Sequence, residues 1–394
     1  MSDLYVGVMS GTSLDGADAV LAEFSPPPAP DDSSAPFSAA LPRILAHAHA
    51  PFPADLAERL LSLQSPAADE LHRAALAANA LADHYALLVS RLLHDARIVA
   101  ARVAAIGAHG QTVRHRPELG YTLQLNAPAR LAEASGIDVI ADFRSRDVAA
   151  GGHGAPLVPA FHASVFADAT RHRAIVNIGG MANITDLPPG QGASASVRGW
   201  DCGPGNVLLD GWIAEQRGFT FDSDGAWASG GTVVAPLFSA LRAEPWFSIA
   251  PPKSTGRERF NLRWLQDRLA TLPPLPPLAA VDVQATLAEL TAWSIADSIA
   301  RFAGDAREVI VCGGGAFNAD LLARLRRMLD ELLDGQSSGS ITVSTSAECG
   351  IPVDQVEALA FACLARQFRL GLPGNLPAVT GAKGLRLLGA LYPR

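Results

Sequence analysis

The chain has 394 residues, of which 49% are hydrophobic, so it can bury a full core as two domains or as one large one. Only 18% of its residues are charged and its formal net charge is −8, which leaves no basic surface for a phosphate backbone and argues against nucleic acid as a partner. No apolar run approaches the roughly 18 residues that span a bilayer, so we expect no membrane span.

The first predicted elements are a strand over residues 4–9 and its return over residues 17–24, joined by the turn SGTSLDG. The proline-rich residues 25–36 predict a solvated surface loop, and the apolar spacing of residues 67–93 predicts an amphipathic helix. Residues 174–187, AIVNIGGMANITDL, repeat the strand, turn and strand of the opening. Two such hairpins, one near the start of each half, favour a duplicated α/β domain with a cleft between the copies over chance similarity.

Two more glycine-rich turns follow in the second half of the chain. DCGPGN predicts a tight turn before a helix that begins near Asn206, and VIVCGGG predicts a buried strand, a turn and then an amphipathic helix. A buried helix over 354–368 precedes a loop and a short C-terminal return. We therefore expect an N-terminal domain of residues 1–141 with 373–394, and a C-terminal domain of residues 142–372.

The four cysteines lie far apart and form no C-x-x-C pair, so we expect a reduced protein without a structural metal. The chain enters its first predicted strand within five residues, and no basic segment followed by an apolar one precedes it. We therefore expect no secretory signal and a cytoplasmic protein.

The opening turn has the composition of a phosphate-binding loop. A polyphosphate needs several converging backbone N–H groups, which small residues allow the main chain to provide. The small residues here are Gly11, Thr12, Ser13 and Gly16. The turn has neither a Walker lysine nor G-x-G-x-x-G, and an ordinary glycine-rich hairpin is the alternative. Asp15 and Asp18 beside the turn favour a site for Mg²⁺ or its water shell.

The turn Gly313–Gly315 is a second candidate for nucleotide binding. Three consecutive glycines lose much conformational entropy on folding, and their lack of side chains would let a flat adenine lie directly on the backbone. Tight packing of the helix on the strand is the alternative. Asn318 either caps the following helix or reaches a ribose or base edge.

Asp201 is the candidate general base, because the Gly-Pro-Gly turn after it fixes its backbone. The alternative is a carboxylate that accepts N–H groups of its own turn. Arg144 and Arg146, in ADFRSRDVAAGGHGAP, suit an anionic substrate group, with a solvated salt-bridge cluster as the alternative. His109 and Gln111 end a predicted strand, where α/β folds place ligands, although a buried core histidine is equally consistent.

These motifs resemble those of bacterial anhydro-N-acetylmuramic acid kinases, in the superfold of sugar kinases, heat-shock protein 70 and actin. MSGTSLDG, HGQTVRH, ADFRSRDVAAGG, NIGGMANIT, DCGPGN, KSTGRE, CGGGAFN, VEALAFA and LPGNLPAVTGA occur in the family's order across nearly the whole chain. The resemblance implies two duplicated ribonuclease-H-like α/β domains with a central ATP and substrate cleft. It also implies an ATP- and Mg²⁺-dependent enzyme of peptidoglycan recycling that converts 1,6-anhydro-N-acetylmuramic acid to N-acetylmuramic acid 6-phosphate.

The resemblance also implies the site residues. The residues for ATP are Gly11, Thr12, Ser13, Leu14, Asp15, Gly16, Ala17, Asp18, Gly179, Gly180, Asn183, Gly313, Gly314, Gly315 and Asn318. Those for the amino-sugar substrate are Gln111, Asp142, Arg144, Arg146 and Glu357, with an arginine for the lactyl carboxylate. Asp201 is the catalytic residue and Asp15 a metal ligand. The sequence leaves the oligomeric state open, with a homodimer as one alternative.

The bridged sugar has no proton on O6, so Asp201 would take a proton from the water that attacks C1, while O6 attacks the γ-phosphorus. Two positions differ from the family's pattern: His153 stands where we expect Gln, which affects a substrate contact, and Cys202 stands where Thr is usual. The rival interpretations are a kinase of a free sugar hydroxyl within the same superfold, and a regulator or actin-like scaffold that binds ATP or sugar without catalysis.

Overall fold

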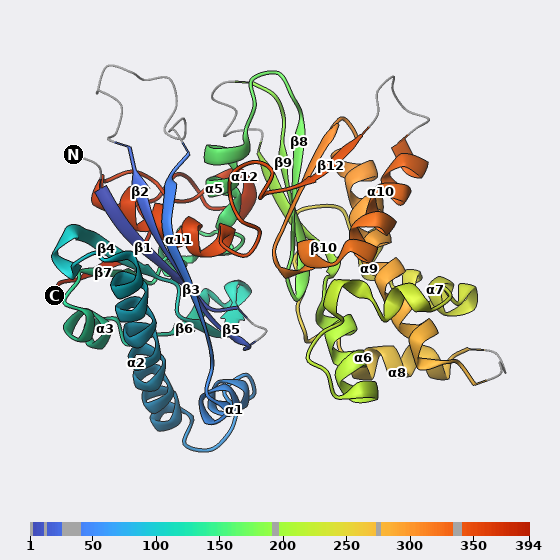
Figure 1. Cartoon of the computed structure of the whole chain (residues 1–394), viewed down its shortest axis with the longest axis horizontal. Helices are drawn as coiled ribbons and strands as arrows, with labels where there is room; N and C mark the ends of the chain where they lie inside the picture. Colours follow the sequence, from blue (N-terminus) through green and yellow to red (C-terminus); the bar gives the residue numbers. More distant parts are fainter. Residues whose placement is uncertain (1–2, 12–13, 26–40, 191–196, 273–276, 334–340) are drawn as a thin grey trace. The chain divides into compact units, whose positions relative to one another are not determined.

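The computed structural model describes residues 3–11, 14–25, 41–190, 197–272, 277–333 and 341–394. The chain divides into two compact units. Unit 1 comprises residues 1–165 and 355–394, and unit 2 comprises residues 166–354. Each unit is built around one β-sheet with helices packed on it (Figure 1).

Unit 1 has a six-stranded sheet. In sheet order, its strands are β13 (Ala390–Tyr392), β7 (Val139–Ala141), β4 (Val103–Ala108), β1 (Asp3–Met9), β2 (Gly16–Phe24) and β3 (Arg43–Pro51). β1, β4 and β7 are parallel, whereas β2 is antiparallel to both β1 and β3, and β13 is antiparallel to β7. A separate hairpin pairs β5 (Gln111–Arg116) with β6 (Tyr121–Leu125).

The two faces of this sheet are covered differently. The helices of unit 1 are α1 (Ala54–Ser62), α2 (Glu70–Ala96), α3 (Pro128–Ser135), α4 (Ser145–Ala149), α5 (Val158–Phe166), α11 (Val356–Arg369) and α12 (Pro377–Thr380), with short turns η1 (Ala100–Arg102) and η2 (Pro117–Leu119). Val6 and Val8 face a core that includes Leu81 of α2. Gly7 and Gly107 face α11, and a Cβ on either would overlap a backbone carbonyl of that helix, so the glycines permit close packing.

Unit 2 has a five-stranded sheet. In sheet order, its strands are β10 (Arg198–Pro204), β9 (Met181–Leu187), β8 (Arg173–Ile178), β11 (Glu308–Cys312) and β12 (Thr342–Thr345). Its helices are α6 (Val207–Arg217), α7 (Ala235–Arg242), α8 (Leu262–Ala270), α9 (Ala280–Phe302) and α10 (Ala319–Leu333), with short turns η4 (Ser223–Gly225), η5 (Ala228–Gly230), η6 (Pro245–Ser248) and η7 (Gly314–Phe317). Apolar residues of α9 and α10, such as Ile295 and Leu325, pack with Val176 and Ile184 of the sheet.

The two sheets share one topology, which confirms the predicted duplicated α/β fold. In both, three consecutive strands form an antiparallel meander, and two later strands extend the sheet parallel to the first: β3-β2-β1-β4-β7 in unit 1 and β10-β9-β8-β11-β12 in unit 2. A long helix, α2 or α9, precedes the fourth strand in each. This is the ribonuclease-H-like arrangement that we expected, while the central cleft stays a prediction.

The boundaries of the units differ from the predicted domain boundaries at 141/142 and 372/373. Residues 142–165 and α11 belong to unit 1. The reason lies in packing, because α11 follows the last strand of unit 2 in the chain but packs on β1, β2 and β4. The sequence shows that this helix is buried, but not against which sheet.

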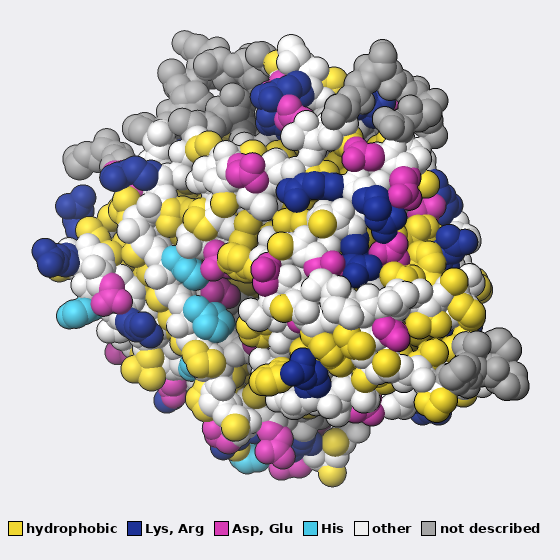
Figure 2. Space-filling view, turned by 45° about the vertical axis from the view of Figure 1, so that its right-hand side comes forward, with side chains coloured by type: hydrophobic (Ala, Val, Ile, Leu, Met, Phe, Trp, Pro, Cys, Tyr) yellow, Lys and Arg dark blue, Asp and Glu magenta, His cyan; other side chains and the backbone are white. Residues whose placement is uncertain are grey.

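The predicted helix over 67–93 corresponds to α2, and that after CGGG corresponds to α10, which buries one apolar face as expected. Most of the predicted proline-rich loop, residues 26–36, lies outside the described residues. Within the described ranges, none of the helices combines the length and the apolar character needed to cross a bilayer. On the face seen in Figure 2, basic side chains lie among acidic and apolar ones.

Candidate active site

In unit 1, the segments that follow β1, β4 and β7 lie together. The Gln111 side chain donates from Nε2 to the carbonyl oxygen of Gly11 at 3.0 Å. The His109 ring lies with Nδ1 3.3 Å from the carbonyl oxygen of Ser10. Because β1, β4 and β7 are parallel, their carboxyl ends meet at one edge of the sheet, which brings the predicted phosphate loop next to the HGQ turn.

The predicted phosphate loop is described in part. Thr12 and Ser13 lie outside the described residues. Leu14 adopts the left-handed region with φ of 60°, and its N–H donates to the Gly11 carbonyl at 3.4 Å. Asp15 is exposed, whereas Asp18 on β2 faces two imidazoles of β3, because its Oδ1 lies 3.0 Å from His47 Nε2 and 3.1 Å from His49 Nδ1.

Arg144 joins this group of turns. Its Nε and Nη2 donate to His109 Nε2 at 3.2 and 2.9 Å, and its Nη1 donates to the Gly154 carbonyl at 2.8 Å. Burial lowers the pKa of Arg144 to about 10, and the negative charge of Glu357 works against that shift. A guanidinium has five N–H groups, so three hydrogen bonds leave two for an anionic ligand.

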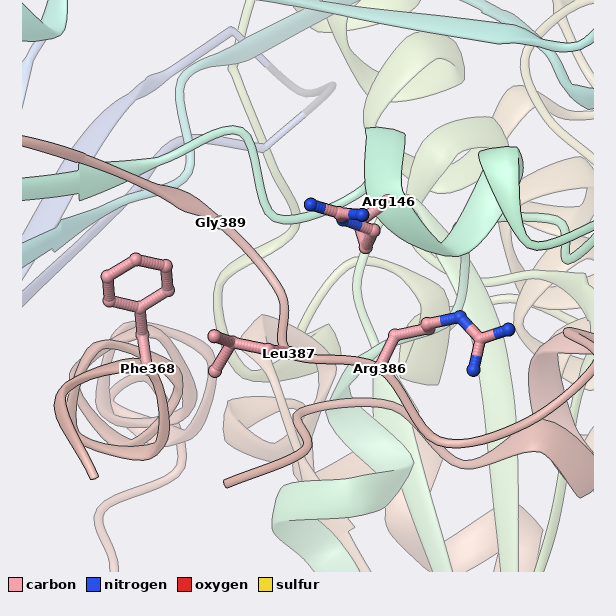
Figure 3. A pocket seen from close by; sticks show the side chains of 5 residues that line it. All are labelled: Arg146, Phe368, Arg386, Leu387 and Gly389. Carbon is pink, nitrogen blue, oxygen red and sulfur yellow. The ribbon is translucent and has the colours of Figure 1, made fainter. Parts of the chain in front are cut away.

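Arg146 and Asp142 have other neighbours. Arg146 lines a pocket with residues of α11 and of the segment before β13, and its side chain is shown with theirs in Figure 3. Those residues are Phe368, Arg386, Leu387 and Gly389. Asp142, with φ of 60°, accepts a hydrogen bond from the Ser145 hydroxyl at 2.5 Å. Among the described contacts, Arg144 and not Arg146 reaches His109 in the HGQ turn beside the predicted phosphate loop.

Asp147 links two segments of unit 1 through hydrogen bonds. Its carboxylate is fully buried and accepts hydrogen bonds from the Gly154 N–H, the Asn375 amide and the Thr380 hydroxyl at 2.7 to 2.8 Å. These bonds tie the loop of Arg144 to the LPGNLPAVTGA segment. His153 in the same loop is exposed, and its N–H donates to the Thr380 carbonyl at 2.7 Å, so the family's Gln position is held by its backbone.

In unit 2, three predicted motifs converge beyond the ends of the strands. The Gly205 N–H donates to the Gly180 carbonyl at 2.9 Å, and the Asn206 N–H donates to the Gly179 carbonyl at 2.8 Å. A Cβ on Gly205 would overlap the Gly179 carbonyl, so the DCGPGN turn approaches the NIGG turn as closely as only glycine allows. Gly313, with φ of 80°, lies against Asn177 and Ile178 in the same region.

Asp201 ends a row of side chains across this sheet. The strand register pairs Asp201 with Asn183, Asn183 with Asn177, and Asn177 with Cys312. Directly paired residues point to the same face of a sheet, so Asn183, which we predicted for ATP, lies beside the catalytic candidate. Asp201 thus lies on strand β10 and not in the loop that follows it.

The Asp201 carboxylate has a perturbed acidity. Burial, together with the negative charge of Glu258, raises its pKa to about 7, although a hydrogen bond from the Thr255 N–H and the charge of Lys253 act in the opposite direction. The Thr255 N–H donates to Oδ2 at 2.8 Å, and no other described residue donates a hydrogen bond to this carboxylate. Oδ1 therefore remains for a proton from a ligand or from water.

Sequence reasoning missed the part that the KSTGRE segment plays in this site. Lys253 lies with Nζ 4.2 Å from the centre of the Trp246 ring, and its carbonyl accepts from the Asp201 N–H at 3.1 Å. The Thr255 hydroxyl is buried and has no hydrogen-bond partner among the described residues. KSTGRE was recognised as a motif, but its position more than 50 residues after Asp201 gives no sign of this contact.

The structure gives hydrogen-bond partners for Asn318 and Cys202. Asn318 caps α10, because its Oδ1 accepts from the Leu321 N–H at 2.9 Å. The thiol of Cys202 is buried and donates to the Ala182 carbonyl at 3.3 Å. The DCGPGN turn is also held by α9, because the Thr291 hydroxyl donates to the Gly205 carbonyl at 3.0 Å.

The chain matches, over residues 3–394, the sequence model of a family described as anhydro-N-acetylmuramic acid kinase. A relative with that description from Cupriavidus pinatubonensis is 54% identical over 396 residues, covering 100% of this chain and 99% of its own. Another, from Paraburkholderia xenovorans, is 53% identical over 391 residues, covering 99% of this chain and 98% of its own.

Similar solved structures include an activator of 2-hydroxyisocaproyl-CoA dehydratase from Clostridium difficile, with 12% identity and a TM-score of 0.46, covering 94% of this chain and 98% of that one. A ROK family glucokinase from Streptomyces griseus has 16% identity and a TM-score of 0.39, with 92% and 99% covered. At these scores the similarity assigns no residue and no ligand to this chain.

Proposed function

Because the chain belongs to the anhydro-N-acetylmuramic acid kinase family and is therefore an ATP-using enzyme, we propose that it opens its sugar substrate with water and phosphorylates it in one reaction. The substrate is 1,6-anhydro-N-acetylmuramic acid, and the products are N-acetylmuramic acid 6-phosphate and ADP. The reaction belongs in the cytoplasm, where ATP is available. A homodimer stays a prediction.

The bond changes balance with one base. Water attacks C1 of the sugar and passes a proton to Asp201, the bond between C1 and O6 breaks, and the electron pair stays on O6. O6 then attacks the γ-phosphorus, and the bond from that phosphorus to ADP breaks. Because O6 has no proton to lose, a base beside O6 would have no task, whereas a base beside the attacking water accounts for the proton that is released.

The state of Asp201 is the observation that supports this proposal best. A general base works best when its pKa lies near the working pH, and burial raises the pKa of this carboxyl to about 7. One carboxylate oxygen is held by the Thr255 N–H at 2.8 Å, which fixes the orientation of the other. The buried hydroxyl of Thr255, which has no partner in the described part of the chain, is a second group that can orient the water.

We propose that ATP is held by the main chain of Gly11 to Asp18 in unit 1, and by Gly179, Gly180 and the Gly313–Gly315 turn in unit 2. The hydrogen bond from Gln111 to the Gly11 carbonyl supports the first assignment, because it fixes the backbone at the start of the loop. The close approach of Gly205 to Gly179 supports the second, because a fixed turn presents its N–H groups in one geometry.

The residues present fit Mg²⁺ that arrives with ATP. Mg²⁺ is usually bound by one or two carboxylates together with the phosphates, and Asp15 is an exposed carboxylate at the predicted phosphate loop. Within the described ranges no group of three metal-binding side chains forms a separate cage. Asp15 would hold the ion, which would neutralise charge on the transferred phosphoryl group.

Labelled water tests the proposal directly. The enzyme is run in H₂¹⁸O with ATP and the anhydro sugar, and the products are analysed by mass spectrometry. We expect one ¹⁸O at C1 of the phosphorylated sugar and none in the phosphoryl group. Because the product's anomeric hydroxyl exchanges slowly with water, a control incubates unlabelled product in H₂¹⁸O for the same time.

Three other outcomes would contradict the proposal. ¹⁸O in released inorganic phosphate, with an intact anhydro bridge, would mean that water attacks ATP. Phosphorylation of free N-acetylmuramic acid at a rate above that of the anhydro sugar would identify a kinase of a free hydroxyl. Binding of ATP and sugar without any product would identify a regulator or scaffold.

A further inference from the structure

Ser10, the first residue after β1, is held by three groups from other parts of unit 1. Its hydroxyl lies 2.6 Å from the Tyr85 hydroxyl of α2 and donates to the Gly110 carbonyl at 3.3 Å. Its carbonyl oxygen lies 3.3 Å from His109 Nδ1. The side chain of Ser10 is 2% exposed, so the entry to the predicted phosphate loop is a built, buried network.

The two nitrogens of His109 have different and fixed roles. Nε2 faces the Arg144 guanidinium at 2.9 and 3.2 Å, and a guanidinium can only donate, so Nε2 must accept. The proton of a neutral imidazole is then on Nδ1, from which it is donated to the Ser10 carbonyl. Burial and the charge of Arg144 lower the pKa of His109 to about 3, which agrees with a neutral ring.

The ring is also fixed from the side. His109 is 5% exposed, and its ring centre lies 4.7 Å from that of Phe361 on α11. Its own N–H donates to the Val8 carbonyl at 3.0 Å, so backbone and side chain both bind the end of β1. Because both ring nitrogens have partners and Phe361 packs against the ring, a small displacement of Arg144 can shift the imidazole and, through it, the Ser10 carbonyl.

We propose that His109 is a positioning residue that couples the loop of Arg144 to the phosphate loop, through Arg144, the imidazole and the Ser10 carbonyl. This inference rests on the proposed function, because it takes Gly11 to Asp18 as the ATP phosphate loop. Arg144 lies in the segment that carries the predicted sugar-binding residues. An anion that engages the two remaining N–H groups of Arg144 thereby acts on the backbone of Ser10, where the phosphate loop begins.

Two substitutions separate the halves of this link. In His109→Gln, Oε1 can replace Nε2 as the acceptor for Arg144, but the donor toward Ser10 is lost. In His109→Asn, Nδ2 can replace Nδ1 as the donor to Ser10, but the acceptor for Arg144 is lost. His84→Gln is the matched control, because His84 also contacts a backbone carbonyl, that of Ala50 at 3.3 Å, and lies in none of the predicted sites.

The test measures the Kd of a non-hydrolysable ATP analogue by calorimetry, with and without the anhydro sugar, on full-length variants whose thermal melting shows that they are folded. We expect His109→Gln to weaken nucleotide binding about threefold to tenfold, as loss of one neutral hydrogen bond predicts. We expect His109→Asn to bind nucleotide within about twofold of the unchanged protein, but to lose the effect of sugar on the nucleotide Kd. His84→Gln should change neither quantity.

Nucleotide affinity of folded His109→Gln equal to that of the unchanged protein would overturn the proposal, and so would an effect of sugar that survives in His109→Asn. A merely structural histidine would lower the melting temperature while both binding quantities stayed the same. If His109→Gln does not fold, Arg144→Met gives the second measurement, because it removes the donor to Nε2. Failure of the unchanged protein to bind nucleotide would instead refute the proposed function.

Discussion

The two units use the same strand order for different chemistry. In unit 1 the charged group of the candidate site is Arg144, a cation with three hydrogen bonds to protein groups. In unit 2 it is Asp201, a carboxylate with a single hydrogen bond from the described residues and a pKa raised to about 7. The two sheets share one strand order, but the side chains at their candidate sites differ, and under the proposed function Arg144 binds an anion while Asp201 acts as the base.

The difference follows from how each group is solvated. A guanidinium with several protein acceptors can be partly buried, because its charge is compensated by hydrogen bonds and by a nearby carboxylate. A carboxylate with one donor is destabilised in its charged form, so it binds a proton readily near neutral pH. The comparison leads to predictions about catalysis, which concern Asp201 in unit 2, and about stability, which concern the contact between the DCGPGN and NIGG turns.

The largest effect is expected from Asp201→Asn. This variant keeps the shape of the side chain but cannot accept the proton of water, so kcat should fall at least about 10²-fold. Nucleotide and sugar affinities, measured by calorimetry, should stay close to those of the unchanged protein. A kcat within tenfold of the original would remove Asp201 from its proposed role.

The melting temperature of Asp201→Asn shows whether the variant is folded, and the pKa of Asp201 predicts its direction of change. The folded-state pKa of Asp201 lies above the usual unfolded value, so ionisation in the folded state costs stability as pH rises through about 7. Asn carries no such cost, and Asp201→Asn should melt no lower than the unchanged protein at pH 8. A lower melting temperature would show that the substitution disturbs the fold.

The second effect is the pH dependence of the unchanged enzyme. Only the ionised carboxylate can act as the base, so kcat/KM should fall about tenfold for each pH unit below about 7. The decrease should disappear from the residual activity of Asp201→Asn. A flat profile between pH 5 and 8 would contradict a base with this pKa.

The third effect is on stability and comes from Gly205→Ala. The new methyl group would overlap the Gly179 carbonyl and push the DCGPGN turn away from the NIGG turn. The free energy of unfolding should fall by about 1–3 kcal/mol. Gly230→Ala is the matched control in the same unit, because a Cβ there meets no atom within 4 Å. Chemical denaturation measures both variants, and equal losses would show that the close approach of the two turns is unimportant.

The smallest effect is expected from Glu258→Gln. The negative charge of Glu258 raises the pKa of Asp201, so its removal should shift the acid limb of the pH profile to lower pH. Because Glu258 is exposed, the shift should shrink as salt is added. A shift to higher pH would contradict the electrostatic account of Asp201.

Local sequence patterns predicted much of the fold. The amphipathic helices α2 and α10 and the opening hairpin of each unit follow from apolar periodicity and from glycines at turns, which depend on neighbouring residues alone. The similarity of the two hairpins also predicted the duplication. The boundaries between the units were not predictable, because α11 packs on strands more than 200 residues away.

The candidate site divides in the same way. The sequence by itself determined that Asp201 directly precedes a Gly-Pro-Gly segment and that small residues form the opening loop, since each is a property of a short segment. The prediction that Gln111 ends a strand was wrong, because β4 ends at Ala108 and Gln111 begins β5. Only the tertiary structure decided that the Thr255 N–H meets Asp201, that Arg144 and not Arg146 contacts His109, and that Asn318 caps α10. Hydrogen bonds between distant segments and the burial that shifts a pKa depend on packing, which the order of residues along the chain does not display.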